Sequence, residues 1–259
     1  MTINKSHLRI KMRYCAVIFL LFMFNHCYAS ETHWVSIAPS LNYTYIPLTQ
    51  IAGTGKLHAF QVDLNYYQLN LVFAPEQHQL VSSVQEMGKF HKAIITINGG
   101  FFTPELQPLG LRLQKNKLIS KLKDISWWGV FYIKDNHAGI ISSSQFQHNP
   151  DIQLALQSGP RLIINGHIPR LKPGYAARSA VCITNDDKII LASTENARIT
   201  TSQLAKLLRA PPQQGGLNCY SALNLDGGSS AQLYANLANF KLHVANFSAV
   251  TDAIIVKKR

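Results

Sequence analysis

The sequence predicts an α+β fold, in which a single domain holds a mixed, mostly antiparallel sheet and a few packed helices. Segments typical of strands outnumber segments typical of helices. Most consecutive strand-like segments are joined by short turns, which indicates hairpins rather than crossovers. Residues 30–259 are enough for one domain with a sizeable core.

Hairpins account for most of the expected strands, because apolar and polar residues alternate on both sides of short polar turns. The expected pairs are 57–64 with 68–73, 128–133 with 138–141, and 179–184 with 188–192. Asn165-Gly166 follows an expected strand over 161–164 and is the strongest short turn signature in the chain. The apolar run 249–256 is expected to close the sheet.

Two helices are predicted by capping boxes. Ser83 with Glu86 begins one helix, and Thr200 with Gln203 begins the other. Pro211-Pro212 ends the second helix. The residues expected on the inner faces are Val84, Met87 and Phe90 in the first helix, and Leu204, Leu207 and Leu208 in the second.

Each expected helix is followed by an apolar run that ends in a polar residue and two glycines. The two motifs are Asn98-Gly99-Gly100 and Asp226-Gly227-Gly228. Missing Cβ atoms allow φ > 0 and let a ligand approach backbone N–H groups. Ordinary turns are the alternative, since Asn-Gly and Asp-Gly often form them. Two such bends in one domain indicate a single polar site built from both.

The first 29 residues are typical of an export signal: a basic start, an apolar core over 16–24, and Cys27-Tyr28-Ala29 before Ser30. The apolar run is too short to span a bilayer, so we expect an exported protein, periplasmic or secreted, with no stable membrane anchor after cleavage. Removing four basic and no acidic residues lowers the formal charge from +12 to +8. No basic run is interleaved with aromatics, so we expect no nucleic-acid partner.

Two cysteines, Cys182 and Cys219, remain after cleavage, and both lie in apolar segments. The sequence favours buried free thiols over a bridge, because pairing between the two segments cannot be inferred from one sequence. Histidines are scattered without metal-ligand spacing. We therefore expect no cofactor, and the sequence leaves a single assisting divalent cation open.

Thirteen acidic residues are few enough to sort individually. Asp226 follows an apolar strand directly, and Glu195 follows another after two polar residues. A catalytic carboxylate belongs at such a strand end, where it is held rigidly. Asp63 and Asp252 are expected to pair with core arginines. Arg178 and Arg161 precede strands, where a guanidinium suits bidentate contact with a phosphate; an ordinary ion pair is the alternative.

Taken together, these residues resemble the phosphodiester glycosidase family, whose animal member is a lysosomal uncovering enzyme. The resemblance covers residues 93–256, with weaker similarity over 57–75. The chain departs from the family pattern at Ser229 and Cys182, where the family has glycines. The matching motifs are Asn98-Gly99-Gly100-Phe101-Phe102, Gln157-Ser158-Gly159-Pro160-Arg161-Leu162, Arg178-Ser179-Ala180-Val181, Leu223-Asn224-Leu225-Asp226-Gly227-Gly228-Ser229-Ser230 and Thr251-Asp252-Ala253-Ile254-Ile255-Val256.

The resemblance implies hydrolysis of a sugar-1-phosphodiester, of small-molecule or oligosaccharide type, at its glycosidic bond. Asp226 is the expected base or nucleophile, Arg178 the phosphate clamp, Asn98 an orienting residue and Glu195 a further catalytic candidate. Expected substrate-binding residues are Gly99, Gly100, Phe101, Ser158, Gly159, Arg161, Gly227, Gly228, Ser229 and Ser230.

Two rival functions stay open at this point. A protein on the same fold could bind polysaccharide or assist envelope assembly without catalysis, and the altered Asp-Gly-Gly-Ser loop leaves room for that. Attack at phosphorus would make the protein an ordinary phosphodiesterase. Two-metal phosphodiesterases need clustered His and Asp ligands, and this sequence shows no such cluster.

Overall fold

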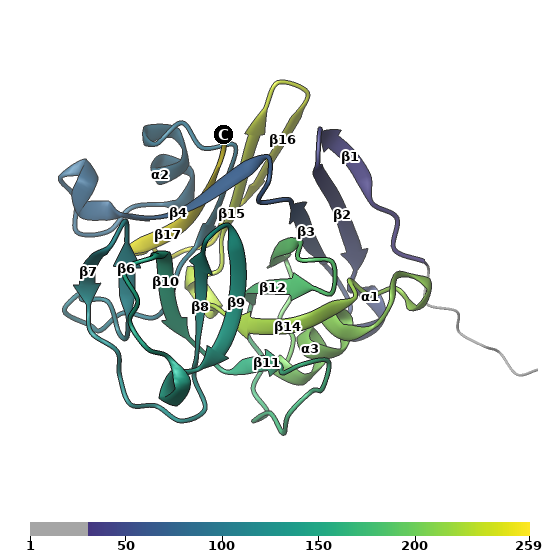
Figure 1. The fold of residues 1–259 in the computed structure, drawn as a ribbon. Coiled ribbons are helices and arrows are strands. Elements are labelled where there is room, and N and C mark those ends of the chain that lie inside the picture. The colour runs from purple at the N-terminus through teal and green to yellow at the C-terminus, as the bar shows by residue number, and fades with distance from the viewer. Residues whose placement is uncertain (1–30) are drawn as a thin grey trace, which may run out of the picture.

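In the described part of the chain, seventeen strands form three sheets around a main apolar core (Figure 1). The computed structural model describes residues 31–259, so the predicted signal peptide and its cleavage site lie outside the described residues. Every strand pairing in the described part of the chain is antiparallel. The expected antiparallel character is therefore confirmed, but the expected single mixed sheet is wrong.

Sheet I has seven strands and carries the Asp226 motif at the end of one of them. Its order is β1 (Val35–Ala38), β2 (Leu41–Pro47), β3 (Lys56–Val62), β13 (Ile189–Glu195), β12 (Ser179–Thr184), β14 (Cys219–Asn224) and β11 (Arg161–Ile163). Since β12 runs antiparallel to both neighbours, the start of β12 and the ends of β13 and β14 lie at one edge.

Sheets II and III have five strands each. Sheet II runs β16 (Phe240–Val244), β15 (Leu233–Leu237), β5 (Ile95–Asn98), β17 (Asp252–Lys258) and β4 (Tyr67–Phe73). Sheet III runs β7 (Lys117–Ser120), β6 (Arg112–Gln114), β10 (Ile152–Ser158), β8 (Gly129–Lys134) and β9 (His137–Ser142). The Asn98 motif thus ends the central strand of sheet II.

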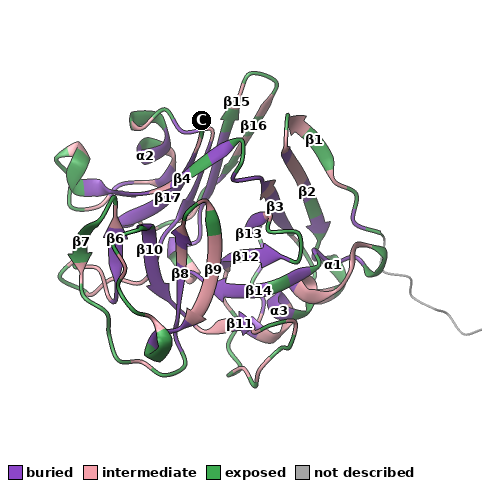
Figure 2. Cartoon of the chain, in the orientation of Figure 1, coloured by how far each residue is buried: buried purple, intermediate pink, exposed green. Residues whose placement is uncertain are grey.

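The main core lies where the three sheets face one another (Figure 2). Phe60 and Leu191 come from sheet I, Ile97 and Ile254 from sheet II, and Phe131 from sheet III, all with at most 1% exposure. Their burial is the main favourable term in folding, about 1.5–3 kcal/mol for each large side chain. A shared core fixes the three sheets relative to one another, which matters because the two glycine motifs belong to different sheets.

Three α-helices and four 3₁₀ turns complete residues 31–259. They are α1 (Thr49–Ala52), α2 (Val84–Phe90), α3 (Thr201–Arg209), η1 (Ala74–Gln77), η2 (Ser143–Gln145), η3 (Pro212–Gln214) and η4 (Gly228–Ser230). Both predicted capping boxes are confirmed. Helix α3 packs on the outer face of sheet I, and α2 on sheet II. No helix among residues 31–259 has the length and apolarity to cross a bilayer.

One predicted hairpin and one predicted helix face are wrong. The strands expected over 57–64 and 68–73 form as β3 and β4, but β3 pairs with β2 and β13 whereas β4 pairs with β17. Alternation predicts a strand but not its partner, and this turn carries the chain between two sheets. Phe90 is 56% exposed, because the short α2 ends there. The hairpins β8–β9 and β12–β13 are confirmed.

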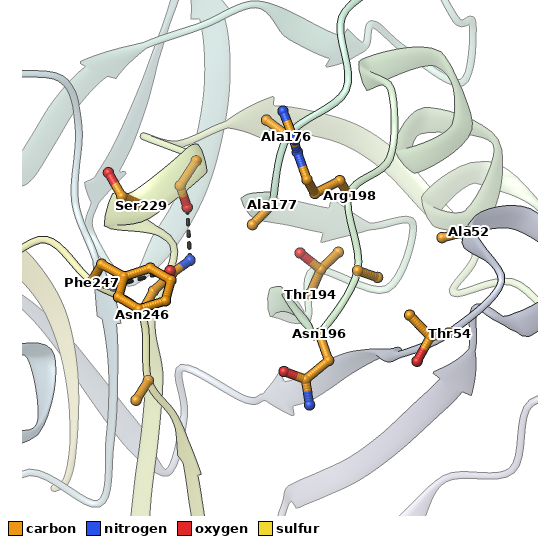
Figure 3. A pocket seen from close by; sticks show the side chains of 13 residues that line it. Ala52, Thr54, Ala176, Ala177, Thr194, Asn196, Arg198, Ser229, Asn246 and Phe247 are labelled. Carbon is orange, nitrogen blue, oxygen red and sulfur yellow. Dashed lines mark hydrogen bonds between the residues drawn. The ribbon is translucent and has the colours of Figure 1, made fainter.

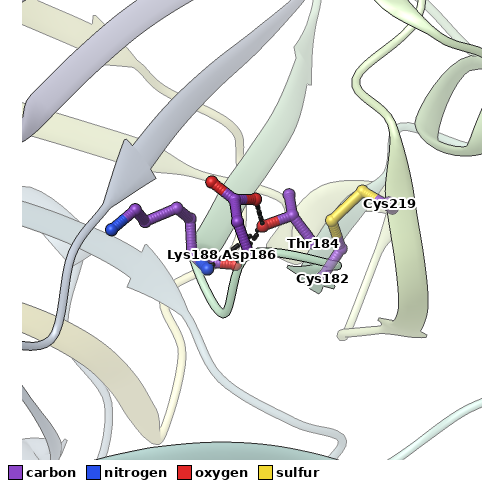
Figure 4. Close-up of a disulfide and its surroundings, with 5 residues drawn as sticks. All are labelled: Cys182, Thr184, Asp186, Lys188 and Cys219. Atoms are coloured by element: carbon purple, nitrogen blue, oxygen red, sulfur yellow. Dashed lines mark hydrogen bonds between the residues drawn. A yellow bond between two sulfur atoms is a disulfide. The ribbon is translucent and has the colours of Figure 1, made fainter.

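The expectation of free thiols is also wrong, because Cys182 and Cys219 form a disulfide (Figure 4). Their Cα atoms lie 5.9 Å apart, since β12 and β14 are neighbours in sheet I. Both residues are fully buried in the layer between sheet I and α3. The bridge links the two strands whose opposite ends carry Arg178 and Asp226.

Candidate functional site

The two glycine bends lie side by side and are hydrogen-bonded to each other. The Asn98 side chain is fully buried, donates from Nδ2 to the Asp226 carbonyl (2.8 Å) and accepts from the Gln232 N–H (3.1 Å). The Asp226 N–H donates to the Gly99 carbonyl at 3.1 Å. Because its amide is used in this way, Asn98 holds the end of β5 against the end of β14. This contact places both motifs at one point between sheets I and II.

The Asp226 carboxyl sits largely buried at this junction. Its Oδ1 accepts from the Gly227 N–H at 2.8 Å, and the Ser230 side chain also bonds to it. Burial raises the pKa of Asp226 from 3.8 to about 6, and nearby Asp252 adds to the rise. The bonds from Ser230 and Gly227, together with the Arg112 charge, act in the opposite direction and lower the pKa. A carboxyl with this pKa is ionised at neutral pH and protonated in mild acid, which suits acid–base or nucleophilic work.

The bends are supported by an ion pair without solvent exposure, formed by Arg112 and Asp252. Arg112 Nε lies 3.1 Å from Asp252 Oδ2, and Asp252 Oδ1 accepts from the Gly100 N–H at 3.1 Å. The other guanidinium nitrogens donate to the carbonyls of Phe101, Leu111 and Gln157. The expected pairing of Asp252 with a core arginine is confirmed. Asp63 pairs with Lys188 instead, at 2.5 Å.

This ion pair explains why Gly99 and Gly100 have no side chains. A Cβ added at Gly99 would overlap Asp252 Oδ1, and one added at Gly100 would overlap Arg112 Nη2. The N–H groups of both motifs' glycines all have acceptors inside the protein. Positions 99 and 100 require glycine because Asp252 and Arg112 lie too close to the backbone there to leave room for a side chain. Position 228 favours glycine because its φ of 61° lies in the left-handed region.

Arg178 and Glu195 lie at the same end of sheet I as the Asp226 loop. The Gly228 N–H donates to the Ala177 carbonyl at 2.8 Å, so the segment before β12 contacts that loop directly. Arg178 donates from Nε to the Ile199 carbonyl (3.0 Å) and from Nη2 to the Gly174 carbonyl (2.5 Å). Burial lowers the pKa of its guanidinium. Through these two hydrogen bonds, Arg178 holds the segments around Gly174 and Ile199 against the start of β12.

Glu195 ends a chain of hydrogen-bonded side chains on β2, β3 and β13. His58 Nε2 lies 3.0 Å from Glu195 Oε2, and His58 Nδ1 lies 2.8 Å from Tyr43 Oη. Burial lowers the pKa of His58, although the hydrogen bond to Glu195 opposes this, and burial raises the pKa of Tyr43 to about 12. The Glu195 side chain is one-third exposed. These hydrogen bonds fix the Glu195 carboxylate, a second one, at the same end of sheet I.

The predicted Ser158-Gly159-Pro160-Arg161 segment runs from β10 into β11 and contains a cis Gly159–Pro160 bond. A Cβ at Gly159 would stand 2.5 Å from Trp128, whose ring lies 5.1 Å from that of Phe101. Trp127 stands 56% exposed beside it. In the described chain, four buried polar atoms gathered around this segment have no hydrogen-bond partner: Trp128 Nε1, Ser158 Oγ, Arg161 Nε and Asn224 Oδ1.

A cavity of about 830 Å³ opens beside the Asp226 loop (Figure 3). Gly228 and Ser229 form one part of its wall, and loop residues after β16 continue it. Asn246 donates to the Gly228 carbonyl (2.8 Å), and Ser248 donates to Ser229 Oγ (2.7 Å). The remaining lining residues are Ala52, Thr54, Ala176, Ala177, Thr194, Asn196, Ala197, Arg198, Ala245 and Phe247.

Sequence reasoning missed Arg112 and the cavity residues Arg198, Asn246 and Phe247. Arg198 lies three residues after Glu195, just beyond the end of β13. A basic residue close to a strand end is a local pattern from which the sequence could have predicted a site residue. No local pattern marks the others, because contacts between segments distant in the sequence bring them to the site. Among the described residues, no group of three or more His, Cys, Asp or Glu side chains is arranged to hold a metal ion. A single assisting divalent cation stays open, as it does from the sequence alone.

Comparison with known proteins gives one family and several similar folds. The family model described as phosphodiester glycosidase matches residues 91–257. The uncharacterized protein YigE of Escherichia coli (strain K12) is 30% identical over 132 residues, which is 46% of this chain. This chain spans about half (51%) of the length of that relative.

Two solved structures show the same fold. The catalytic domain of zebrafish N-acetylglucosamine-1-phosphodiester alpha-N-acetylglucosaminidase, auto-inhibited by its pro-peptide, superposes with a TM-score of 0.65 at 22% identity. That match covers 89% of this chain and 87% of the zebrafish chain. A hypothetical protein from Synechocystis gives a TM-score of 0.62 at 16% identity, covering 89% of this chain and 64% of the other.

Replacing Asp252 by Asn should destabilise the whole fold. The change leaves the Arg112 guanidinium buried without an anion, and we expect the free energy of unfolding to fall by about 3–5 kcal/mol. Urea denaturation at pH 7 measures it. The matched control is Asp151→Asn, because Asp151 pairs with Lys134 at the surface and should contribute less than about 1 kcal/mol. Equal losses in the two variants would contradict a supporting role for the buried pair.

The raised pKa of Asp226 predicts a pH-dependent stability difference. Between about 3.8 and about 6 the folded state holds a proton that the unfolded chain has released, so wild-type stability falls as pH rises through this window. The Asp226→Asn variant lacks this group. Unfolding free energies of both proteins measured from pH 3.5 to 7.5 should therefore show the wild type losing stability relative to the variant up to about pH 6. A constant difference would show that the carboxyl is not desolvated.

Proposed function

Because this chain belongs to the phosphodiester glycosidase family, we propose that it hydrolyses the glycosidic bond of a sugar-1-phosphodiester to give free sugar and a phosphomonoester. One observation carries the proposal. The two family motifs converge at Asp226, whose carboxyl is partly buried, and the loop that follows it lines a cavity of about 830 Å³. The zebrafish relative's name specifies an N-acetylglucosamine-1-phosphodiester, so that diester is the first substrate to test.

Asp226 acts at the anomeric carbon in this proposal. As a carboxylate it either attacks C1 directly or removes a proton from the attacking water. The C1–O bond breaks, its electron pair stays on the phosphate oxygen, and the oxygen of water ends on the sugar. The departing phosphomonoester is a better leaving group than an alcohol, so less protonation is needed. The pKa of about 6 keeps Asp226 ionised at neutral pH while leaving it basic enough to accept a proton.

A cation near the cavity supports the departure of the phosphate. Arg198 lines the cavity and uses Nη2 to donate to the Tyr175 carbonyl (3.0 Å). We therefore place Arg198 among the phosphate ligands, since a guanidinium presents five donors. The phosphate contacts predicted for Arg178 and Arg161, and the sugar contacts of Ser229 and Ser230, stay predictions. Asn98 and the Arg112–Asp252 pair act in this proposal by positioning Asp226.

Glu195 is the second carboxylate at the site edge, and His58 and Tyr43 hold it in place. We propose that it assists proton transfer to or from water once substrate is bound. Its partial exposure allows exchange of protons with solvent. The phosphate departs without a strong acid in this scheme, so loss of Glu195 should reduce turnover less than loss of Asp226.

We propose that the protein is exported. The bridge between Cys182 and Cys219 supports this, because disulfides form and persist in oxidising compartments. In a bacterial host, N-terminal sequencing of the purified protein should find Ser30 first, and the protein should fractionate outside the cytoplasm. A protein that keeps Met1 and remains in the cytoplasm would contradict export.

The proposed chemistry is tested with a panel of α-sugar 1-phosphate methyl diesters that begins with N-acetylglucosamine and includes glucose, galactose, mannose and N-acetylgalactosamine. Wild-type protein should release free sugar from at least one member. Asp226→Asn should fold normally and lower kcat by at least about 10³-fold. Turnover near the wild-type rate would remove Asp226 from the chemistry.

Two controls separate the rivals. In ¹⁸O-labelled water the label should enter the sugar; label in the phosphate would mean attack at phosphorus. Diester binding without any product would indicate a non-catalytic binding protein. For wild type, kcat/KM should fall as pH drops below about 6, because Asp226 becomes protonated.

A further inference from the structure

Phe247 stands almost entirely in solvent at the rim of the cavity. Its exposure is 99%, more than that of any other large hydrophobic residue in the described chain. A single exposed hydrophobic residue is common on protein surfaces and carries no meaning by itself. Phe247 differs in what holds it, because its loop is tied to the loop that follows Asp226.

Hydrogen bonds on both sides of Phe247 fix its backbone. Before it, Asn246 donates from Nδ2 to the Gly228 carbonyl (2.8 Å), and its Oδ1 accepts from the Phe247 N–H (3.0 Å). After it, Ser248 donates through its hydroxyl to Ser229 Oγ (2.7 Å) and through its N–H to the Ser229 carbonyl (3.1 Å). These bonds hold the Phe247 backbone in a defined place relative to the loop that follows Asp226.

The other cavity residues have the chemistry of a carbohydrate site. Among the described residues that line the cavity, Arg198 is the only charged one, and the rest are alanines, glycines, hydroxyls, amides and Phe247. Figure 3 shows Phe247 on one side with Thr194 and Asn196 across the opening. Hydroxyl and amide side chains bond to sugar hydroxyls, while an aromatic ring offers an apolar face to the C–H groups of a pyranose.

We propose that Phe247 is the stacking platform for the sugar ring of the substrate, with Asn196 as a partner for its hydroxyls. This inference rests on the proposed function and adds the subsite that recognises the sugar. Arg198 lines the same cavity, and in this proposal the phosphate on C1 binds its guanidinium. The placement also puts C1 near the loop that carries Asp226.

Binding rather than turnover tests the platform. The probes are the five sugar 1-phosphates that correspond to the diester panel, with inorganic phosphate as the sugar-free control, and titration calorimetry gives each Kd. At least one sugar 1-phosphate should bind wild type, and Phe247→Ala should weaken it about 5–20-fold. Phe247→Trp should restore the affinity to within about twofold, because stacking needs a ring face. Inorganic phosphate should bind both variants as it binds wild type.

Phe90→Ala is the matched control. Phe90 is also an exposed phenylalanine, but it ends α2 and is not part of the cavity. Its replacement should change no Kd. Unchanged affinity in Phe247→Ala, an equal effect of Phe90→Ala, or binding of no sugar 1-phosphate to wild type would overturn the platform. Sugar binding that depends on Phe247, without hydrolysis of any diester, would instead leave the platform standing and defeat the proposed reaction.

Discussion

The buried pair of Arg112 and Asp252 is the interaction on which the rest of the site depends. It joins sheet III to sheet II, and its remaining hydrogen-bonding groups hold the backbone around Gly100 and Phe101. Two charges without water are stable only when every donor and acceptor around them is satisfied. The glycines of the first motif exist because a side chain there would collide with this pair.

Once the first bend is fixed, the second follows from it. Asn98 bonds to the backbone of Asp226, and the Asp226 N–H bonds back to Gly99. The carboxyl is thereby carried into a desolvated position between two sheets, and desolvation raises its pKa to about 6. The raised pKa of Asp226 is thus a consequence of how sheet II meets sheet I.

The opposite side of the Asp226 loop faces a different environment. There the loop is bonded to the segment 246–248, which holds Phe247 in solvent beside a cavity lined by small and uncharged polar residues. One short loop therefore connects the partly buried Asp226 carboxyl to the wall of an open cavity. In the proposed function, the cavity offers an aromatic face to the sugar ring and Arg198 to the phosphate group.

The sequence by itself determined the family and many of the elements, but it gave no signal for β1, β2, β6, β7, β10, β15, β16 and α1. Local patterns predict features that depend on neighbours within a few residues. These features are the capping at Ser83 and Thr200, the hairpins around 134–137 and 185–187, and the motifs at Asn98 and Asp226. Only the tertiary structure decided which strands pair. It separated β3 from β4, joined Cys182 to Cys219, and brought Arg112 to Asp252 and Phe247 to the cavity. These contacts link residues far apart in the chain, and alternation of side chains records which face is buried but not which strand lies next to it.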